Sequence, residues 1–224
     1  MNFNKLTSGK TIEDSEIKAF RSEIISKKYI YLLAGVHGDE VEGVYVLKKL
    51  FEWIKEDNNL ELPFIVVPIL NMDGHRSGTR VNSNGVDLNR NLNSSSWTAD
   101  YTEKKYFPGK RPMSEPENKF LKGLFDKFPP KIIFSFHTWK PLINYDGQIK
   151  DIAEFLSKRN GYKVFDHLED HPTPGSLGSY ATEKYKCPVL TFECPELSDD
   201  LTLEDIWNHN KLALTELFES NLIK

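Results

Sequence analysis

Short runs of residues that carry almost no charge recur along this chain and constrain its fold more than any other feature. They are rich in β-branched and aromatic side chains, as expected for strands covered on both faces. The runs are Tyr29–Ala34, Phe64–Leu70, Ile132–Phe136 and Val189–Phe192. Segments with apolar residues at helical spacing separate them, and this alternation is typical of an α/β fold. We therefore predict a mostly parallel, mixed central sheet flanked by helices on both faces.

The segments between and after the strands supply the expected helices. Apolar residues at helical spacing predict them over residues 41–54, 114–128, 152–161 and 203–218. The second should open with a capping box, because Glu117 follows Ser114 at the required spacing. A short edge strand or hairpin is expected between Lys10 and Phe20, with a short helix as the alternative. Residues 71–111 are rich in Asn, Ser and Gly and should be mostly loop.

Size and composition are those of an ordinary globular protein. The chain has 224 residues, of which 39% are hydrophobic and 28% charged, so we expect a single domain over residues 1–224. A net charge of -4 gives no reason to expect a nucleic acid or membrane partner. Residues 1–6 lack the features of a secretory signal, which favours a cytoplasmic location. Cys187 and Cys194 flank a predicted buried strand and are expected to be free thiols. The oligomeric state is not indicated.

The segment His37-Gly38-Asp39-Glu40 directly follows the first strand and precedes the first helix. The strand delivers His37 to the carboxyl edge of the sheet, and Glu40 lies at the start of the helix, so both side chains can face one ion. Taken alone, the pattern is weak, because a histidine and a glutamate at this spacing also occur by chance. The alternative is a loop histidine and a glutamate that favours the helix dipole.

Further candidates follow the other predicted strands, where ligand sites of open α/β sheets lie. His137 follows the third run, and Glu193 follows the fourth. Together with His137, the earlier pair His37 and Glu40 gives a two-histidine, one-carboxylate set, which suits a hydrolytic zinc with an open position for water. Burial would raise the pKa of Glu193 after its apolar run, as a general base beside a metal-bound water requires.

Each of these residues also has a simpler interpretation. His137 could be a core histidine bonded to the backbone, and Glu193 could be a strand-end carboxylate that faces solvent. The remaining histidines have no partner at ligand spacing and are expected to be structural: His75, His167, His171 and His209.

The stretch from Asn71 to Asn91 narrows these possibilities. It contains in order the turn Asn71-Met72-Asp73-Gly74, then Arg80, then the box Gly85-Val86-Asp87-Leu88-Asn89-Arg90-Asn91. Placed between the first metal-ligand pair and His137 and Glu193, this order strongly resembles the zinc metallocarboxypeptidase family, the carboxypeptidase A-like funnelins. The resemblance covers roughly residues 30 to 195, and it implies the zinc carboxypeptidase sandwich fold and one zinc ion per chain.

The resemblance also implies roles in catalysis. His37, Glu40 and His137 would bind zinc. Glu193 would activate the water and later protonate the leaving amine. Arg80 would stabilise the oxyanion, since a fixed cation beside the scissile carbonyl stabilises charge that appears only in the transition state.

Substrate binding would fall to Asn89 and Arg90, which would hold the terminal carboxylate of a small peptide, as an arginine fork matches a carboxylate. Asp87 would accept a hydrogen bond from the first zinc-binding histidine and fix its tautomer. Arg76 is the rival of Arg80 for the oxyanion role. We prefer Arg80, because it lies closer to the Gly-Val-Asp box.

Two departures from the family pattern bear on the site. Met72 replaces the usual proline of the turn, a change that Asp73 and Gly74 should tolerate. Larger members place a tyrosine in a mobile loop before the catalytic glutamate. Tyr180 and Tyr185 are the candidates here, and Tyr180 is assigned to substrate binding, with packing on a helix face as the favoured alternative.

The segment Thr173-Pro174-Gly175-Ser176 and the residues after it look like the same part of short bacterial members of the murein peptide amidase A type. That resemblance implies a cytoplasmic enzyme of peptidoglycan recycling that cuts the γ-D-glutamyl–diaminopimelate bond of murein tripeptide. Two alternatives remain open. One is an N-acyl amino acid deacylase similar to succinylglutamate desuccinylase or aspartoacylase. The other is a non-catalytic module that binds peptidoglycan peptides.

Overall fold

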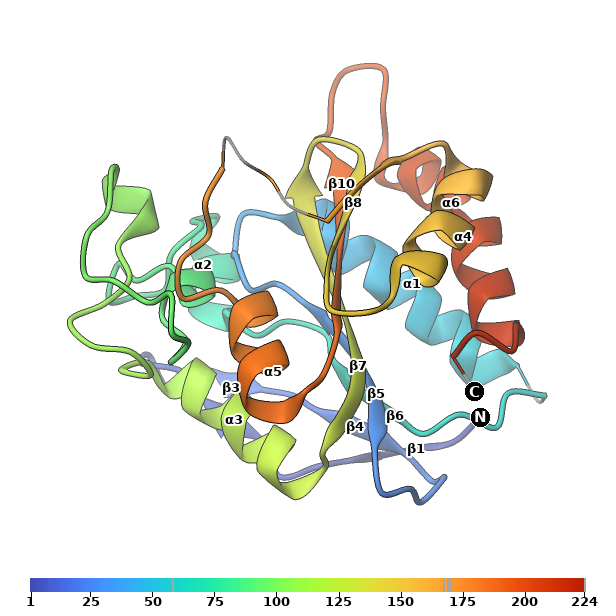
Figure 1. The fold of residues 1–224 in the computed structure, drawn as a ribbon, viewed down its shortest axis with the longest axis horizontal. Helices are drawn as coiled ribbons and strands as arrows, with labels where there is room; N and C mark the ends of the chain where they lie inside the picture. Colours follow the sequence, from blue (N-terminus) through green and yellow to red (C-terminus); the bar gives the residue numbers. More distant parts are fainter. Residues whose placement is uncertain (58, 167, 169–170, 224) are drawn as a thin grey trace.

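One eight-stranded sheet forms the centre of the molecule in the residues that the structure, a computed structural model, describes: 1–57, 59–166, 168 and 171–223. Its strand order is β1-β4-β6-β5-β7-β10-β8-β9 (Figure 1). The bounds of these strands are Phe3–Lys5 for β1, Phe20–Ser22 for β4, Tyr29–Ala34 for β5, Phe64–Val67 for β6, Pro130–Trp139 for β7, Leu142–Asp146 for β8, Lys163–Phe165 for β9 and Val189–Pro195 for β10.

The middle of the sheet is parallel and its flanks are mixed. Strands β6, β5, β7 and β10 pair in parallel, whereas β4 joins β6, β1 joins β4 and β8 joins β10 in antiparallel fashion. The expected mostly parallel, mixed sheet is therefore confirmed. A separate antiparallel pair, β2 (Gly9–Lys10) and β3 (Glu16–Ile17), forms the hairpin expected between residues 10 and 20.

Helices cover both faces of this sheet (Figure 1). Helices α1, α4 and α6 lie on one side, and α3 and α5 lie on the other. The described helices are α1 (Val41–Glu56), α2 (Met72–Ser77), α3 (Pro116–Lys127), α4 (Lys150–Asn160), α5 (Leu177–Tyr185) and α6 (Leu203–Glu219), with 3-10 turns η1 (Leu88–Arg90) and η2 (Lys104–Tyr106). None of the helices in the described part of the chain is long and apolar enough to cross a membrane.

Strand β5 shows why the apolar runs lack charge. Ile30 and Leu32 pack into the core beneath α1, α4 and α6, while Tyr31 and Leu33 pack into the core beneath α3 and α5. Successive side chains of a strand point to opposite faces, so a strand between two helical layers buries every residue. All six residues of β5 are buried. The two cysteines are buried and free, as expected.

The prediction of a capping box at Ser114 is wrong. Helix α3 begins at Pro116 with Glu115 as its N-cap, and no side chain caps it. Ser114 Oγ donates instead to Glu115 Oε1 at 2.6 Å. Proline has no N–H to be capped and its fixed φ suits the first helical position, so the helix starts one residue later than the motif indicated.

The segment 71–111 contains one helix that the sequence pattern did not predict. The side chain of Asn71 accepts a hydrogen bond from Gly74 N at 3.0 Å and caps α2, and Gly78 ends the helix with φ of 62°. A single capped turn without apolar periodicity is invisible to a hydrophobic pattern.

Glu117, in the first turn of α3, offers a test of how this side of the molecule is stabilised. Its side chain is fully buried, Oε2 accepts from Asn82 Nδ2 at 3.2 Å, and Oε1 has no hydrogen-bond partner among the described residues. Burial raises its pKa from 4.5 to about 7. The folded protein therefore retains a proton that the unfolded chain has released, and stability falls as the pH rises from about 4.5 through about 7.

We expect Glu117→Gln to remove this loss, because the amide keeps the shape of the side chain without a charge. Above pH 7.5 the variant should exceed the wild type in free energy of unfolding by on the order of 1–3 kcal/mol, with little difference near pH 4.5. Urea denaturation at a series of pH values measures this. Parallel pH profiles for the two proteins would show that Glu117 does not ionise in this range.

Candidate active site

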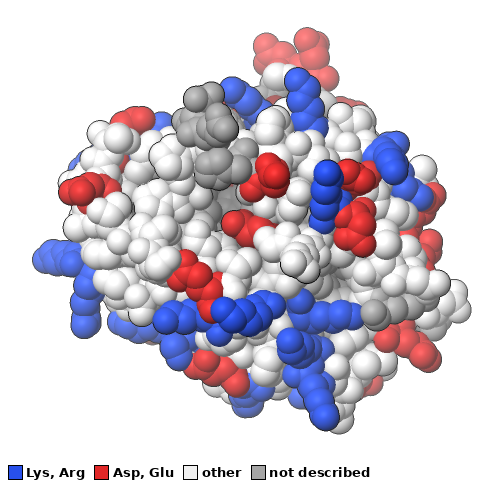
Figure 2. Space-filling view, viewed as in Figure 1, with Lys and Arg blue, Asp and Glu red and all other residues white. Residues whose placement is uncertain are grey.

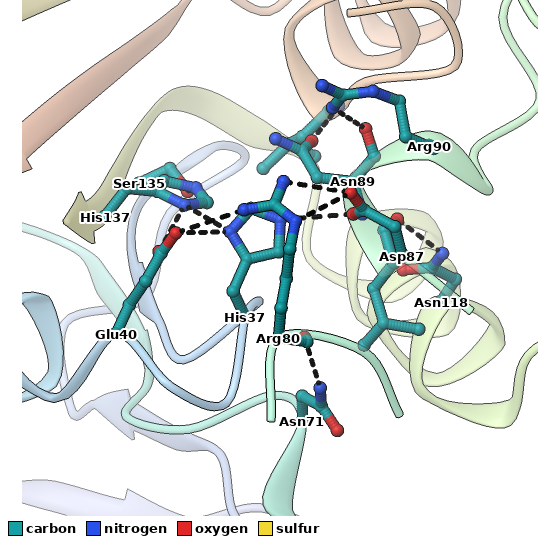
Figure 3. A network of polar contacts seen from close by, with 12 residues as sticks. His37, Glu40, Asn71, Arg80, Asp87, Asn89, Arg90, Asn118, Ser135 and His137 are labelled. Atoms are coloured by element: carbon teal, nitrogen blue, oxygen red, sulfur yellow. Dashed lines mark hydrogen bonds and ion pairs between the residues drawn. The ribbon is translucent and has the colours of Figure 1, made fainter. Parts of the chain in front are cut away.

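Three buried side chains meet above the carboxyl ends of β5 and β7 (Figure 3). His37 lies in the loop between β5 and α1, Glu40 is the N-cap residue of α1, and His137 lies near the end of β7. Glu40 Oε1 is 2.6 Å from His37 Nδ1, and its Oε2 is 2.8 Å from His137 Nδ1. The three ligand atoms lie within 4.8 Å of one another, and this is the metal-type cluster found among the described residues.

The second nitrogen of each imidazole is also held. His37 Nε2 is 3.1 Å from Asp87 Oδ1, and His137 Nε2 is 2.9 Å from Ser135 Oγ. Both Nδ1 atoms therefore face the carboxylate of Glu40. Metal-binding histidines almost always carry such a partner on the ring nitrogen that does not bind the ion. A buried two-histidine, one-carboxylate donor set of this kind fits a hydrolytic metal ion.

Close backbone packing fixes these positions. A Cβ on Gly43 would lie 3.0 Å from His137 N, so glycine at this position lets α1 approach β7 closely. Gly43 N also donates to Thr138 Oγ1 at 3.2 Å. A Cβ on Gly38 would lie 2.1 Å from Gly74 C. Because residue 38 is glycine, the loop that carries His37 can lie directly against α2.

Glu193 lies beside the cluster because of the sheet register. In the parallel pairing of β7 with β10, Glu193 is the direct partner of His137. The side chains of partner residues in neighbouring strands lie on the same face. Glu193 Oε2 is shielded from solvent and has no hydrogen-bond partner among the described residues. Burial raises the pKa of Glu193 to about 7, although His137 and His37 oppose the shift.

Asp87 joins the imidazole side of the site to the arginine side. It is fully buried, and its Oδ2 accepts two hydrogen bonds from Arg80, at 3.1 Å from Nε and 2.9 Å from Nη2. Arg80 Nη1 also lies 3.6 Å from Glu40 Oε1. Burial opposes ionisation of Asp87, but His37 and Arg80 lower its pKa well below the usual range.

The ionisation of the other two partners follows from the same contacts. Burial alone would lower the pKa of His37, yet Glu40 and Asp87 raise it to about 9. Burial would raise the pKa of Glu40, but the two imidazoles outweigh burial and lower it. Attraction between the positively charged His37 and Arg80 and the negatively charged Glu40 and Asp87 therefore stabilises these four buried side chains.

The structure brings Arg80 to the cavity and leaves Arg76 outside. Arg76 Nη1 donates to Ser15 Oγ at 3.1 Å on the exposed side of α2. Asn89 and Arg90 both line the cavity. Asn89 Oδ1 accepts from Leu177 N at 2.8 Å, which ties the 3-10 turn η1 to the start of α5.

Tyr180 does not reach the cavity. Its ring is 3% exposed in the core beneath α5 and packs edge-on against Tyr185 at 5.8 Å. Tyr185 donates from its hydroxyl to Asp126 Oδ1 at 2.7 Å, and neither tyrosine lines the cavity in the described residues. The expected substrate contact of Tyr180 is therefore replaced by packing on the buried face of an amphipathic helix.

Other aromatic side chains line the cavity instead. Tyr106 from η2 and Trp139 from the end of β7 both border it, and the ring of His171 lies between them, 6.0 Å from Tyr106 and 5.1 Å from Trp139. His171, which was expected to be structural, thus also lines the cavity. The expectation for His167 falls outside the described residues. An aromatic residue directly after two lysines in a polar loop was the available signal for Tyr106.

The cavity has a volume of about 730 Å³. Its lining includes alternate residues of two strands, Asn144 and Asp146 of β8 and Thr191 and Glu193 of β10. Leu177 and Gly178 at the start of α5 also line it. Figure 2 shows basic and acidic side chains interspersed over this face of the molecule.

We expect Gly43→Ala to damage the cluster by steric contact alone, because the new methyl group would push α1 away from His137. The variant should lose about 1–2 kcal/mol of unfolding free energy and bind zinc more weakly. Gly123→Ala is the matched control, because a Cβ at this α3 glycine meets nothing within 4 Å. It should be neutral or stabilising by up to about 1 kcal/mol.

Urea denaturation and zinc titration of both variants test this expectation. Equal stability and equal zinc affinity of Gly43→Ala and the wild type would show that the contact between α1 and β7 can relax without cost.

A family model described as the succinylglutamate desuccinylase/aspartoacylase catalytic domain matches residues 26–115. Carboxypeptidase A from Helicoverpa armigera shares the fold, with a TM-score of 0.79, 17% identity, and coverage of 97% of this chain and 68% of that one. The sheet thus has the metallocarboxypeptidase fold, and the His-Glu-His cluster lies at the carboxyl ends of its central strands.

Closer relatives narrow the class. Murein peptide amidase A from Vibrio campbellii is 32% identical over 213 residues, covering 88% of this chain and 81% of the relative. Murein-tripeptide amidase from Escherichia coli O157 has a TM-score of 0.76 and 25% identity, covering 95% of this chain and 90% of that one. The chain belongs to the murein peptide amidase A family.

Proposed function

We propose that this protein is a zinc-dependent amidase that cuts the amide bond next to a free carboxylate of a small peptide, with murein tripeptide as substrate and the γ-D-glutamyl–diaminopimelate bond as the target. The observation that carries the proposal is the register of β7 and β10, which pairs Glu193 with His137 beside a buried metal-type cluster. The names of the relatives support the choice of substrate.

His37, Glu40 and His137 would hold one zinc ion per chain. When bound, zinc polarises a carbonyl oxygen and lowers the pKa of a water ligand to about 7. Asp87 and Ser135 would keep the two imidazoles oriented toward the ion through their hydrogen bonds.

Glu193 would act as general base and then as general acid. Burial raises the pKa of Glu193, which favours a carboxylate that accepts a proton from the attacking water and returns it to the leaving amine. Arg80, fixed by Asp87, would stabilise the negative charge that develops on the carbonyl oxygen.

Arg90 and Asn89 would bind the free carboxylate of the substrate. Arg90 is 5% exposed and its Nη1 donates to the backbone oxygen of Asn89 at 3.0 Å. Burial and the neighbouring Arg80 lower the pKa of Arg90, so an anionic ligand would relieve the repulsion between these two cations. The proposal further treats residues 1–224 as one catalytic domain that acts in the cytoplasm during peptidoglycan recycling.

Glu193→Gln tests the proposed mechanism. The amide cannot accept the proton, so kcat for the tripeptide should fall by about 10²–10⁴-fold. Bound zinc should stay at one per chain by metal analysis, because Glu193 is not among the proposed ligands. Hydrolysis at the wild-type rate with zinc in place would refute the role of Glu193.

A second candidate function is deacylation of an N-acyl amino acid, which the family match over residues 26–115 favours. That stretch includes the first two proposed ligands and the Asp87 to Arg90 box but neither His137 nor Glu193. A non-catalytic peptide-binding module is the third possibility.

The substrates separate these candidates. We expect the wild-type protein with zinc to hydrolyse L-alanyl-γ-D-glutamyl-diaminopimelate and to leave N-succinylglutamate intact, as monitored by release of the free amine. Exclusive cleavage of N-succinylglutamate would establish the deacylase, and tripeptide binding without any hydrolysis would establish the module.

A further inference from the structure

Tyr106 occupies a central position on the arginine side of the cavity. It is the last residue of η2, is half-buried and lines the cavity. The centroid of its ring lies 5.3 Å from Arg80 Cζ and 5.5 Å from Arg90 Cζ. A cation within about 6 Å of an aromatic centroid is attracted by the negative face of the ring. One ring therefore contacts both guanidinium groups to which the proposed reaction assigns a task.

The two arginines are compensated unequally. Arg80 has the bidentate contact with Asp87 and lies near Glu40. Arg90 makes no ion pair within the described residues, and the hydrogen bond recorded for its guanidinium is the one to Asn89 O. A buried cation without a carboxylate partner is costly, so the ring of Tyr106 provides part of the compensation that Arg90 otherwise lacks.

Asp87 is the carboxylate that most strongly raises the pKa of Arg90. Asp87 is already shared between His37 and Arg80. If Arg90 turned toward it, the guanidinium would be neutralised inside the protein and its donors would no longer be available to a ligand. The ring of Tyr106 gives Arg90 a different contact.

We propose that Tyr106 is a positioning residue whose ring holds the guanidinium groups of Arg80 and Arg90 side by side and keeps Arg90 free to bind the carboxylate of the substrate. The inference rests on the proposed function in one respect, the assignment of Arg90 to that carboxylate. The ring face makes the contact, so Phe can replace Tyr106, whereas an aliphatic side chain of similar size cannot.

Steady-state kinetics of Tyr106→Phe and Tyr106→Leu test the inference with two substrates. One is L-alanyl-γ-D-glutamyl-diaminopimelate, and the other is the same peptide with the carboxylate next to the scissile bond converted to a carboxamide. For the free acid, Tyr106→Leu should raise KM by about tenfold, and Tyr106→Phe should keep the wild-type KM. Little change in kcat is expected, because the two hydrogen bonds from Arg80 to Asp87 still hold Arg80 in place. For the carboxamide, all three proteins should have the same KM.

Tyr101→Leu is the matched control. Tyr101 is an exposed aromatic residue of the same segment, does not line the cavity, and packs against Phe107 at 5.2 Å. It should leave KM for both peptides unchanged. An equal rise in KM for the acid and the carboxamide in Tyr106→Leu would overturn the inference while leaving the proposed function in place.

A crystal structure of Tyr106→Leu, or of Tyr106→Met if the first variant does not fold, decides the inference without any substrate. We expect the guanidinium of Arg90 to move into an ion pair with Asp87. Unchanged positions of Arg80 and Arg90 would overturn the positioning role. Failure of the wild-type protein to hydrolyse the tripeptide would overturn the proposed function instead, and the crystal structure would still decide the role of the ring.

Discussion

The rest of the site depends on the interactions of one fully buried carboxylate, that of Asp87. An ionised group without solvent must be paired on every side, and here the partners are His37, Arg80 and the backbone N–H of Asn89. These residues come from a loop after β5, the segment after α2 and the turn η1. The segment between β6 and α3 is thereby drawn over the end of the sheet. Figure 3 shows the resulting network, in which Asp87 joins the metal-type cluster to Arg80.

The fold was largely predictable because its central strands lie between two helical layers. Their composition alone identifies such strands, and in a parallel sheet their carboxyl ends meet at one edge. His37, His137 and Glu193 could therefore be assigned to one site before any distance was known. The register that makes His137 and Glu193 direct partners was not accessible, because it depends on how long each strand is and where its pairing begins.

Other features could not be predicted from the sequence, and the physical reason differs from one to the next. Helix α2 is held by one capping side chain and one left-handed glycine, without an apolar face. Tyr180 looked like a site residue by position along the chain, but the rotation of α5 turns it into the core. Tyr106 belongs to a loop, and the course of a loop is determined by contacts with distant residues such as Arg80 and Arg90.

Alternate residues of two neighbouring strands, β8 and β10, line part of the cavity. Asn144 of β8 is paired with Thr191 of β10, and Asp146 is paired with Val189, two residues further from Glu193. Because side chains alternate between faces, the lining residues of each strand are two residues, about 7 Å, apart. A new side chain at one of these positions would shorten or recharge the pocket without moving any residue of the cluster. The side chains that meet a ligand in this part of the pocket are thus separate from the residues of the His-Glu-His cluster.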